Sequence, residues 1–266
     1  MTNSTTTDAS VINSAVESLE EPQKVEVKTV APPETEVTLP GGFITGEGSL
    51  VKYAEVRELN GMDEEAISKS GSIGRAMNLM LQRGVVSIGM DKVSKEEVDQ
   101  LLSGDRDALL IGIRKITFGS EVDYHVICPS CSEELDVKVD LNKDVPYVTL
   151  DDPINDRVFT YTTRKGEEVV VKLPTGSTQK KLFESADKTV SELNTILLAG
   201  CVESVNGFPS VGTAAALKLG MVDRENLVAE ILKRNPGPRL GEVTTTCAAC
   251  GKEIPMPLSL ADLFRL

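Results

Sequence analysis

The sequence predicts an α+β fold in which two β-hairpins carry cysteine pairs at their tips, with flanking helices and a small α+β insert between them. Two Cys-x-x-Cys pairs, each framed by short β-rich runs, and a mixture of helical and strand patterns elsewhere lead to this fold. Residues 1–42 differ from the rest of the chain in composition, because they contain no aromatic side chain. We therefore expect four segments: a tail at 1–42, an α+β region with the first hairpin at 43–143, an inserted unit at 144–238, and the second hairpin with a C-terminal helix at 239–266.

The expected N-terminal tail is polar and acidic. Residues 1–42 open on a Ser/Thr/Asn-rich stretch and hold seven acidic against two basic side chains. Such a composition cannot repay the entropy of ordering, so we expect disorder. Within the tail, Val25–Val30 alternates like a strand and could add to a sheet edge of a partner, although a solvated linker is the simpler interpretation.

Turn and periodicity signals predict the first ordered elements. Leu50–Leu59 is expected to form a strand, and Asn60–Glu65 a turn that leads into a short helix. Apolar residues recur at helical spacing over Ile73–Arg83, which predicts a second helix, and Gly84–Gly89 can follow it as a strand.

A capping pattern and an apolar stripe predict the next two helices. Ser94 and Glu97 form a capping box, so a helix should run from there to Leu102. Asp105 can cap the following helix, 106–117, which turns an apolar face to the core. Three basic residues of this helix are expected to face solvent or acidic partners: Arg106, Arg114 and Lys115.

The inserted unit should combine a hairpin with helices. The β-rich runs Val158–Thr162 and Val169–Leu173 flank a charged turn. The helices expected after them are 177–198, 213–219 and 223–233. Proline and glycine at 235–238 stop the last helix. Near the chain's end, Ser259 can cap a terminal turn that packs against the second hairpin.

The two cysteine pairs have the pattern of a zinc site of the zinc-ribbon kind. A Cys-x-x-Cys turn can aim two thiolates at one point, and two such turns complete a tetrahedral S4 shell, which suits zinc or an iron–sulfur centre. The expected ligands are Cys128, Cys131, Cys247 and Cys250. Gly251 follows one pair and suits a left-handed turn, whereas Ser132 in the other half departs from that pattern. Ordinary zinc ribbons separate their pairs by roughly 15 to 20 residues, so something has been inserted into this one.

Two disulfides or buried free thiols are the alternatives to a metal. The N-terminus has no signal-peptide pattern, which favours a reducing compartment. Two Cys-x-x-Cys turns at hairpin tips then favour a structural Zn²⁺ over a redox pair. Because four thiolates close the shell, this zinc should hold structure rather than activate water.

Composition limits the classes of partner. The net charge of −13 argues against binding along a nucleic-acid backbone, which requires basic side chains that neutralise phosphates. Apolar runs fall short of the roughly 20 residues that a membrane helix needs. We therefore expect proteins as partners, and neither nucleic acid nor membrane.

The sequence offers little for catalysis. Phosphate-binding glycine loops, Gly-x-Ser-x-Gly and His-Glu-x-x-His are absent. The single histidine, His125, is expected on a hairpin strand, and Cys201 in a core. Asp105 and Asp107 are explained by their place at a predicted helix start. We therefore expect no enzyme.

Several motifs in order suggest a family. They are Leu59–Glu65, Leu101–Lys115, Gly119 and the Cys128–Cys131 turn. In this order they resemble T4-like bacteriophage base-plate proteins, whose members are linked to assembly of the central hub of contractile tails. The resemblance covers mainly residues 50–142 and includes the C-terminal cysteine pair.

The resemblance implies a non-enzymatic virion component or assembly factor that contacts other phage tail and baseplate proteins. It implies action in the host bacterial cytoplasm during assembly and leaves open whether the protein stays in the virion. Two other classes remain: a zinc-ribbon nucleic-acid-binding or transcription module, which predicts a basic face, and a metal-dependent hydrolase, which needs an open zinc position. The acidic composition weighs against the first and the closed S4 shell against the second.

Overall fold

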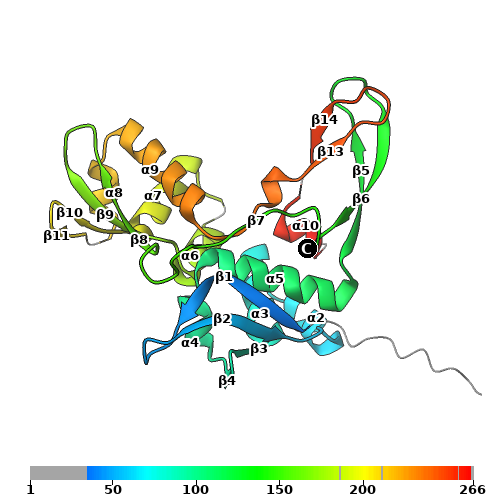
Figure 1. The fold of residues 1–266 in the computed structure, drawn as a ribbon, viewed down its shortest axis with the longest axis horizontal. Helices are drawn as coiled ribbons and strands as arrows, with labels where there is room; N and C mark the ends of the chain where they lie inside the picture. Colours follow the sequence, from blue (N-terminus) through cyan, green and yellow to red (C-terminus); the bar gives the residue numbers. More distant parts are fainter. Residues whose placement is uncertain (1–34, 186, 211, 257, 265–266) are drawn as a thin grey trace, which may run out of the picture. The chain divides into compact units, whose positions relative to one another are not determined.

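The N-terminal part of the fold is a four-stranded antiparallel sheet with helices packed against it. The computed structural model describes residues 35–185, 187–210, 212–256 and 258–264 (Figure 1). The strands of this sheet lie in the order β1 (Glu36–Ile44), β2 (Leu50–Val56), β3 (Val85–Ile88) and β4 (Asp91–Lys92). Helices and small antiparallel sheets also make up the rest of the described chain, which confirms the α+β fold class.

The first strand begins inside the segment expected to be a tail. Residues 1–34, which include Val25–Val30, lie outside the described residues. Residues 36–42, however, belong to β1, where Val37 pairs with Ala54 and Leu39 is buried. These apolar side chains complete the core beneath the sheet, so ordering them removes apolar surface from water. The tail boundary at residue 42 is therefore placed too late.

Local capping signals set the starts of the short helices. Between β2 and β3 lie α2 (Gly61–Ser68) and α3 (Ile73–Gly84), and α4 (Lys95–Gln100) follows β4. Asn60 caps α2 with Asp63 in a reciprocal capping box. The predicted box of Ser94 and Glu97 is confirmed at α4, with both hydrogen bonds formed.

The long central helix, α5 (Ser103–Phe118), differs from its prediction in both start and exposure. It begins three residues earlier than expected, so Asp105 lies inside the helix rather than at its cap. Gly104 allows this start to touch the chain near residue 236, because a Cβ at Gly104 would collide with the carbonyl oxygen of Pro236. The expectation that Arg106 and Arg114 face solvent is wrong, since both are buried.

Arg106 is buried because side chains from three other helices meet its guanidinium. It donates to the Oε1 atom of Gln179 at 2.8 Å, to the carbonyl oxygen of Val98 at 2.9 Å and to the carboxylate of Asp99 at 3.0 Å. Asn78 of α3 accepts a further hydrogen bond. Gln179 in turn donates to Asp107 at 2.7 Å. The Asp105–Asp107 cluster is thus a packing junction and not a capping motif.

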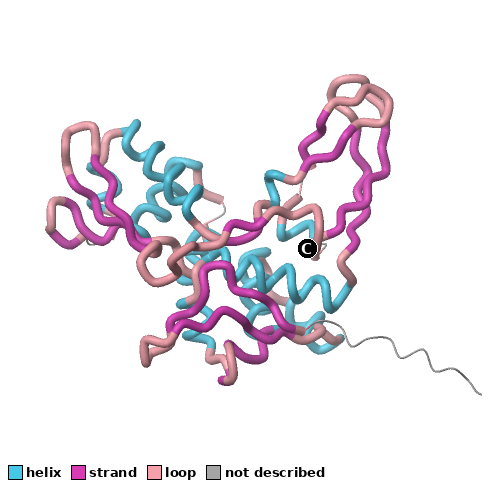
Figure 2. Tube along the Cα trace, viewed as in Figure 1, coloured by secondary structure: helices cyan, strands magenta, loops and turns pink. Residues whose placement is uncertain are grey.

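The inserted unit has its own small sheet and core. Four strands form a sheet in the order β11-β10-β9-β8: β8 (Val158–Thr162), β9 (Glu168–Lys172), β10 (Val202–Val205) and β11 (Phe208–Pro209). Figure 2 draws the strands of the molecule in magenta. Its helices are α6 (Gly176–Glu184), α7 (Val190–Cys201), α8 (Ala214–Lys218) and α9 (Met221–Arg234). The core between sheet and helices includes Val171, Leu198, Cys201 and Ile231, so the buried position expected for Cys201 is confirmed.

The predicted helix 177–198 is divided into two. Its first part, α6, ends at Glu184, and α7 starts only after Thr189. A capping box between Thr189 and Glu192 provides the new start, and its two backbone hydrogen bonds are both formed. The sequence prediction joined the two helices because it relied on apolar periodicity and did not include this cap.

The hairpins that carry the cysteines are two-stranded sheets, separate from the two larger sheets. One consists of β5 (Glu121–Ile127) and β6 (Glu134–Asp140), and the other of β13 (Thr244–Thr246) and β14 (Glu253–Pro255). A 3-10 turn, η1 (Leu240–Glu242), precedes β13, and α10 (Leu260–Leu263) closes the described chain with the predicted Ser259 cap. The two hairpins and α10 share a third core with Ile111 of α5.

The two ends of the inserted unit are joined directly by backbone pairing. Strand β7 (Tyr147–Val148) pairs antiparallel with β12 (Gly237–Pro238), so Val148 lies opposite Gly237. The chain therefore enters and leaves the inserted unit at one place, next to the start of α5.

Candidate metal centre

The four cysteines of the two hairpin tips come together in space. Their Sγ atoms all lie within 4.8 Å of one another, although the two pairs are far apart in the sequence. The Sγ atom of Cys128 lies 3.7 Å from that of Cys250, and the Sγ atom of Cys131 lies 3.6 Å from that of Cys247. In Figure 1 the tips of the β5–β6 and β13–β14 hairpins lie side by side.

These separations fit a tetrahedral metal site. With metal–sulfur bonds of about 2.3 Å, the edges of an S4 tetrahedron are about 3.8 Å long. The cysteines are free rather than paired in disulfides. A closed shell of four thiolates is a possible structural metal site for zinc or for iron, and it leaves no fifth position for a reacting water.

Both cysteine turns have the same backbone conformation. In the first, the N–H of Ser132 donates to the carbonyl oxygen of Cys128 at 2.9 Å, and in the second Gly251 donates to Cys247 at 2.8 Å. The residue after each second cysteine is left-handed, with φ of 61° at Ser132 and 69° at Gly251. Ser132 therefore adopts the left-handed conformation that glycine has in the other turn, and the two turns keep the same shape.

Backbone N–H groups favour a thiolate at the first cysteine. Hydrogen bonds from the N–H groups of Ser130 and Cys131 lower the pKa of Cys128 to about 6, against the effect of burial. The N–H of Glu133 also lowers the pKa of Cys131, but burial and the neighbouring thiols raise it to about 12. Several thiolates this close together repel one another, and a divalent cation removes that repulsion.

One side of the cluster is buried and the other meets solvent. Cys128 and Cys247 are each 1% exposed and pack with Ile254 and Leu135, whereas Cys131 and Cys250 are exposed. The inner cysteines thus join the tips of the two hairpins to a small apolar cluster beneath them.

The other residues singled out in the sequence lie outside this cluster. His125 is on an exposed face of β5 with its Nδ1 atom 2.9 Å from the carboxylate of Asp136, which raises its pKa. The group of potential ligands that the described residues bring together consists of cysteines alone. His125 is therefore a strand histidine, as expected, and Cys201 lies in the core of the inserted unit, where burial raises its pKa to about 12.

Comparison with protein families decides the identity of the chain. Residues 68–212, more than half of the sequence, match the family described as T4 bacteriophage base plate protein. The chain belongs to this family. The searches of curated proteins and of solved structures gave no match. As a base plate protein it is a phage structural component that interacts with other tail proteins, and this membership points to a non-enzymatic role in the tail.

The family match includes only one half of the cysteine cluster. It contains Cys128 and Cys131 but ends before Cys247 and Cys250. Within the part of this base plate protein that the structure describes, no helix has the length and apolar character needed to span a bilayer.

Sequence reasoning missed the surroundings of Arg114 and Tyr124. Arg114 donates to the carbonyl oxygen of Leu263 in the C-terminal helix and to that of Gly119, and the hydroxyl of Tyr124 is buried without a hydrogen-bond partner. Nothing in the local pattern distinguishes Arg114 from a solvent-facing helix arginine, because its acceptor on Leu263 lies far along the chain.

Proposed function

We propose that this chain is a non-enzymatic component or assembly factor of the baseplate of a contractile phage tail, held in shape by a structural Zn²⁺. The ion would be bound by Cys128, Cys131, Cys247 and Cys250. The observation that carries the proposal is the convergence of these four thiols in a member of the base plate family. The protein would act in the host cytoplasm during assembly and bind other baseplate proteins there.

The zinc would act on the hairpins and not on the insert itself. The pairing of β7 with β12 already closes the inserted unit, whose core draws its buried side chains from residues 169–231. Each hairpin has only two strands, β13 and β14 have three residues apiece, and two-stranded hairpins on their own are marginally stable. A metal at the tips would fix one hairpin against the other and so create a rigid surface for partners.

The same observations support the proposed segments. An α+β region to residue 143, an inserted unit over 144–238 and a C-terminal hairpin from 239 agree with the separate cores and with the β7–β12 pairing. The N-terminal tail would end before β1.

A test of the function is mass spectrometry of purified phage particles together with pull-downs from infected cells. Presence in particles would identify a baseplate subunit, and presence only in assembly intermediates would identify an assembly factor. The proposal would be contradicted if the chain were absent from the particles and its pull-downs recovered no tail protein.

Cysteine variants connect this function to the metal. Cys128→Ser and Cys250→Ser should lower metal content, loosen both hairpins and reduce recovery with tail proteins, because metal binding and folding are coupled. The matched control is Cys201→Ala, which removes a thiol from the core of the inserted unit and should leave metal content unchanged. Full metal content and unchanged melting in both cysteine-to-serine variants would refute the proposal that a metal ion joins the two hairpins.

A further inference from the structure

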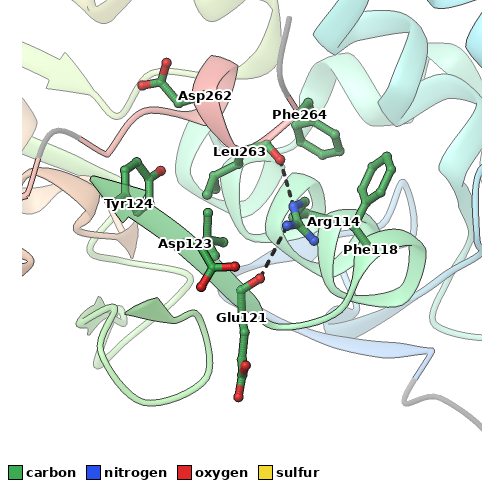
Figure 3. Close-up of a pocket in the computed structure, with 9 residues that line it drawn as sticks. Arg114, Phe118, Glu121, Asp123, Tyr124, Asp262, Leu263 and Phe264 are labelled. Atoms are coloured by element: carbon green, nitrogen blue, oxygen red, sulfur yellow. Dashed lines mark hydrogen bonds between the residues drawn. The ribbon is translucent and has the colours of Figure 1, made fainter. Parts of the chain in front are cut away.

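A hollow of about 490 Å³ lies where the end of α5, the start of β5 and α10 meet (Figure 3). We call it the acidic hollow. Its lining residues are Arg114, Phe118, Glu121, Val122, Asp123, Tyr124, Asp262, Leu263 and Phe264. Glu121 to Tyr124 come from the first cysteine hairpin and the last three from the C-terminal helix, so the hollow joins segments that are far apart in the sequence.

The arginine of this hollow is engaged with the protein backbone. Arg114 donates from Nε to the carbonyl oxygen of Leu263 and from Nη1 to that of Gly119, both at 2.7 Å. Its Nη2 atom lies 3.5 Å from the carbonyl oxygen of Glu121, and the residue is 7% exposed. The guanidinium thus holds the C-terminal helix against α5.

Three carboxylates give the lining its negative character. Glu121 and Asp123 have exposed side chains, and their cationic neighbour Lys138 lies 3.5 Å and 3.9 Å from them, itself 71% exposed. Exposed pairs of this kind contribute little and are easily exchanged. Asp262, on α10, accepts a hydrogen bond from the hydroxyl of Ser259.

The hydroxyl of Tyr124 is a polar group without a partner in the same lining. It is buried and makes no hydrogen bond. Burial and the nearby charge of Asp262 raise the pKa of Tyr124, so the hydroxyl keeps its proton at neutral pH. A buried hydroxyl that lacks a partner is costly.

A second, mainly apolar hollow of about 480 Å³ adjoins the first. It shares Phe118 and Phe264 with the acidic hollow and is lined further by Leu59, Ile67 and Met80. We call it the apolar hollow. The rings of Phe118 and Phe264 pack edge to face with centroids 6.5 Å apart, and Phe118 is 60% exposed. An exposed aromatic ring packed on a partly buried one, between two hollows, is typical of a protein-binding surface.

We propose that these two hollows together bind one segment of another baseplate protein, which places an arginine or lysine side chain beside Glu121 and Asp123, the two carboxylates that Lys138 reaches together. A large apolar side chain of the same segment occupies the apolar hollow beside Phe118. This inference rests on the proposed function and names the chemistry of the partner. Carboxylates favour a cation and disfavour an anion, and the chain's charge of −13 favours a basic partner overall.

The direct test is photo-cross-linking in infected cells with the full-length chain. A photo-reactive p-benzoylphenylalanine replaces Phe118 in one variant and Phe208, which is exposed on β11 of the inserted unit, in a second. Mass spectrometry then identifies the partner peptide joined to each position. The expected result is a cross-link from position 118 to a segment of a tail protein that has an arginine or lysine close to a large apolar residue.

Charge variants decide whether the carboxylates recognise that segment. In the position-118 background, Glu121→Gln with Asp123→Asn should lower the cross-link yield about fivefold or more. Tyr124→Phe should leave the yield unchanged and thermal stability unchanged or higher, because it removes a buried hydroxyl that has no partner. Asp151→Asn with Glu225→Gln, two exposed changes that remove the same charge outside both hollows, should leave the yield unchanged.

Failure of this inference can be separated from failure of the proposed function. A cross-link at position 118 to a segment without a basic residue or to a second copy of this chain would overturn the inference. An unchanged yield in the charge variants, or tail-protein cross-links at position 208 alone, would overturn it too. In all these cases the baseplate role itself would stand if the chain is recovered with tail proteins. Loss of that recovery would refute both.

Discussion

Ser132 occupies a backbone position that glycine fills more easily. Its φ of 61° lies in the left-handed region, and Gly251 occupies the equivalent position of the other turn. Non-glycine residues pay about 1 kcal/mol for this conformation. Ser132→Gly should therefore raise the free energy of unfolding of the metal-loaded protein by about 0.5 to 1 kcal/mol, measured by urea denaturation.

The reciprocal change provides the control. A Cβ at Gly251 would meet no atom within 4 Å, so Gly251→Ala introduces backbone strain without a clash. It should destabilise by about the same amount. A Ser132→Gly variant that is less stable than the parent would show that the serine side chain stabilises the turn.

Asp105 makes stability depend on pH in an unusual direction. Its Oδ1 atom accepts a hydrogen bond from the N–H of Gly41 at 2.6 Å, while Oδ2 is buried without a partner. Burial raises the pKa of Asp105 to about 7, against the effects of Gly41 and Arg157. The folded protein thus keeps a proton that the unfolded chain loses near pH 4, about the usual aspartate pKa. This contribution to stability is complete below pH 4 and is lost as the pH rises to about 7.

Asp105→Asn should flatten the decline of unfolding free energy between pH 4 and 7, because the variant has no carboxyl to titrate there. The measurement is urea denaturation across that range, with Asp151→Asn as the exposed control. Both proteins keep the cysteine cluster, so its own pH dependence cancels in the difference. Asp107, whose pKa burial raises to about 6, accounts for a remaining slope. Parallel pH profiles for Asp105→Asn and the parent would contradict this role.

At the scale of elements, the buried guanidinium of Arg106 connects α5 to α3, α4 and α6. Its acceptors come from Asn78, Asp99 and Gln179, with 1% of the arginine exposed. Arg106→Lys keeps the charge but cannot reproduce the planar set of donors. It should cost about 3 kcal/mol of unfolding free energy, since partners remain buried without hydrogen bonds.

Denaturation of Arg106→Lys beside Arg75→Lys checks this expectation. Arg75 is exposed on α3, where its Nε atom donates to the hydroxyl of Ser72, so its replacement should change stability by less than about 0.5 kcal/mol. A loss at Arg106 as small as that at Arg75 would show that the junction does not stabilise the packing of these helices.

Elements defined by nearby residues could be predicted from the sequence, whereas those defined by distant partners could not. The Ser94 cap and the 158–173 hairpin depend on contacts a few residues apart, and both are confirmed. The burial of Arg106 and Arg114 depends on acceptors at Gln179 and Leu263, which no local pattern reveals. Periodicity likewise extended one helix across the Thr189 cap.

At the scale of the whole molecule, the cysteine pattern predicted the hairpins but not what else joins them. The spacing of each pair indicated a turn, and the structure brings all four thiols together. The pairing of β7 with β12 and the β1 strand at residues 36–44 went unpredicted, because two-residue bridges and an edge strand that contains glycines leave a weak signal. The identity of the metal stays a proposal, because the cysteine spacing specifies sulfur ligands and not the ion.

The central claim is that one metal ion joins the two hairpins of this base plate protein. X-ray absorption spectroscopy at the zinc edge, on the full-length chain purified without added metal, tests it most directly. The account predicts one zinc per chain with four sulfur neighbours at about 2.3 Å. A zinc with fewer than four sulfur donors, or a folded protein whose four cysteines bind no metal, would contradict it.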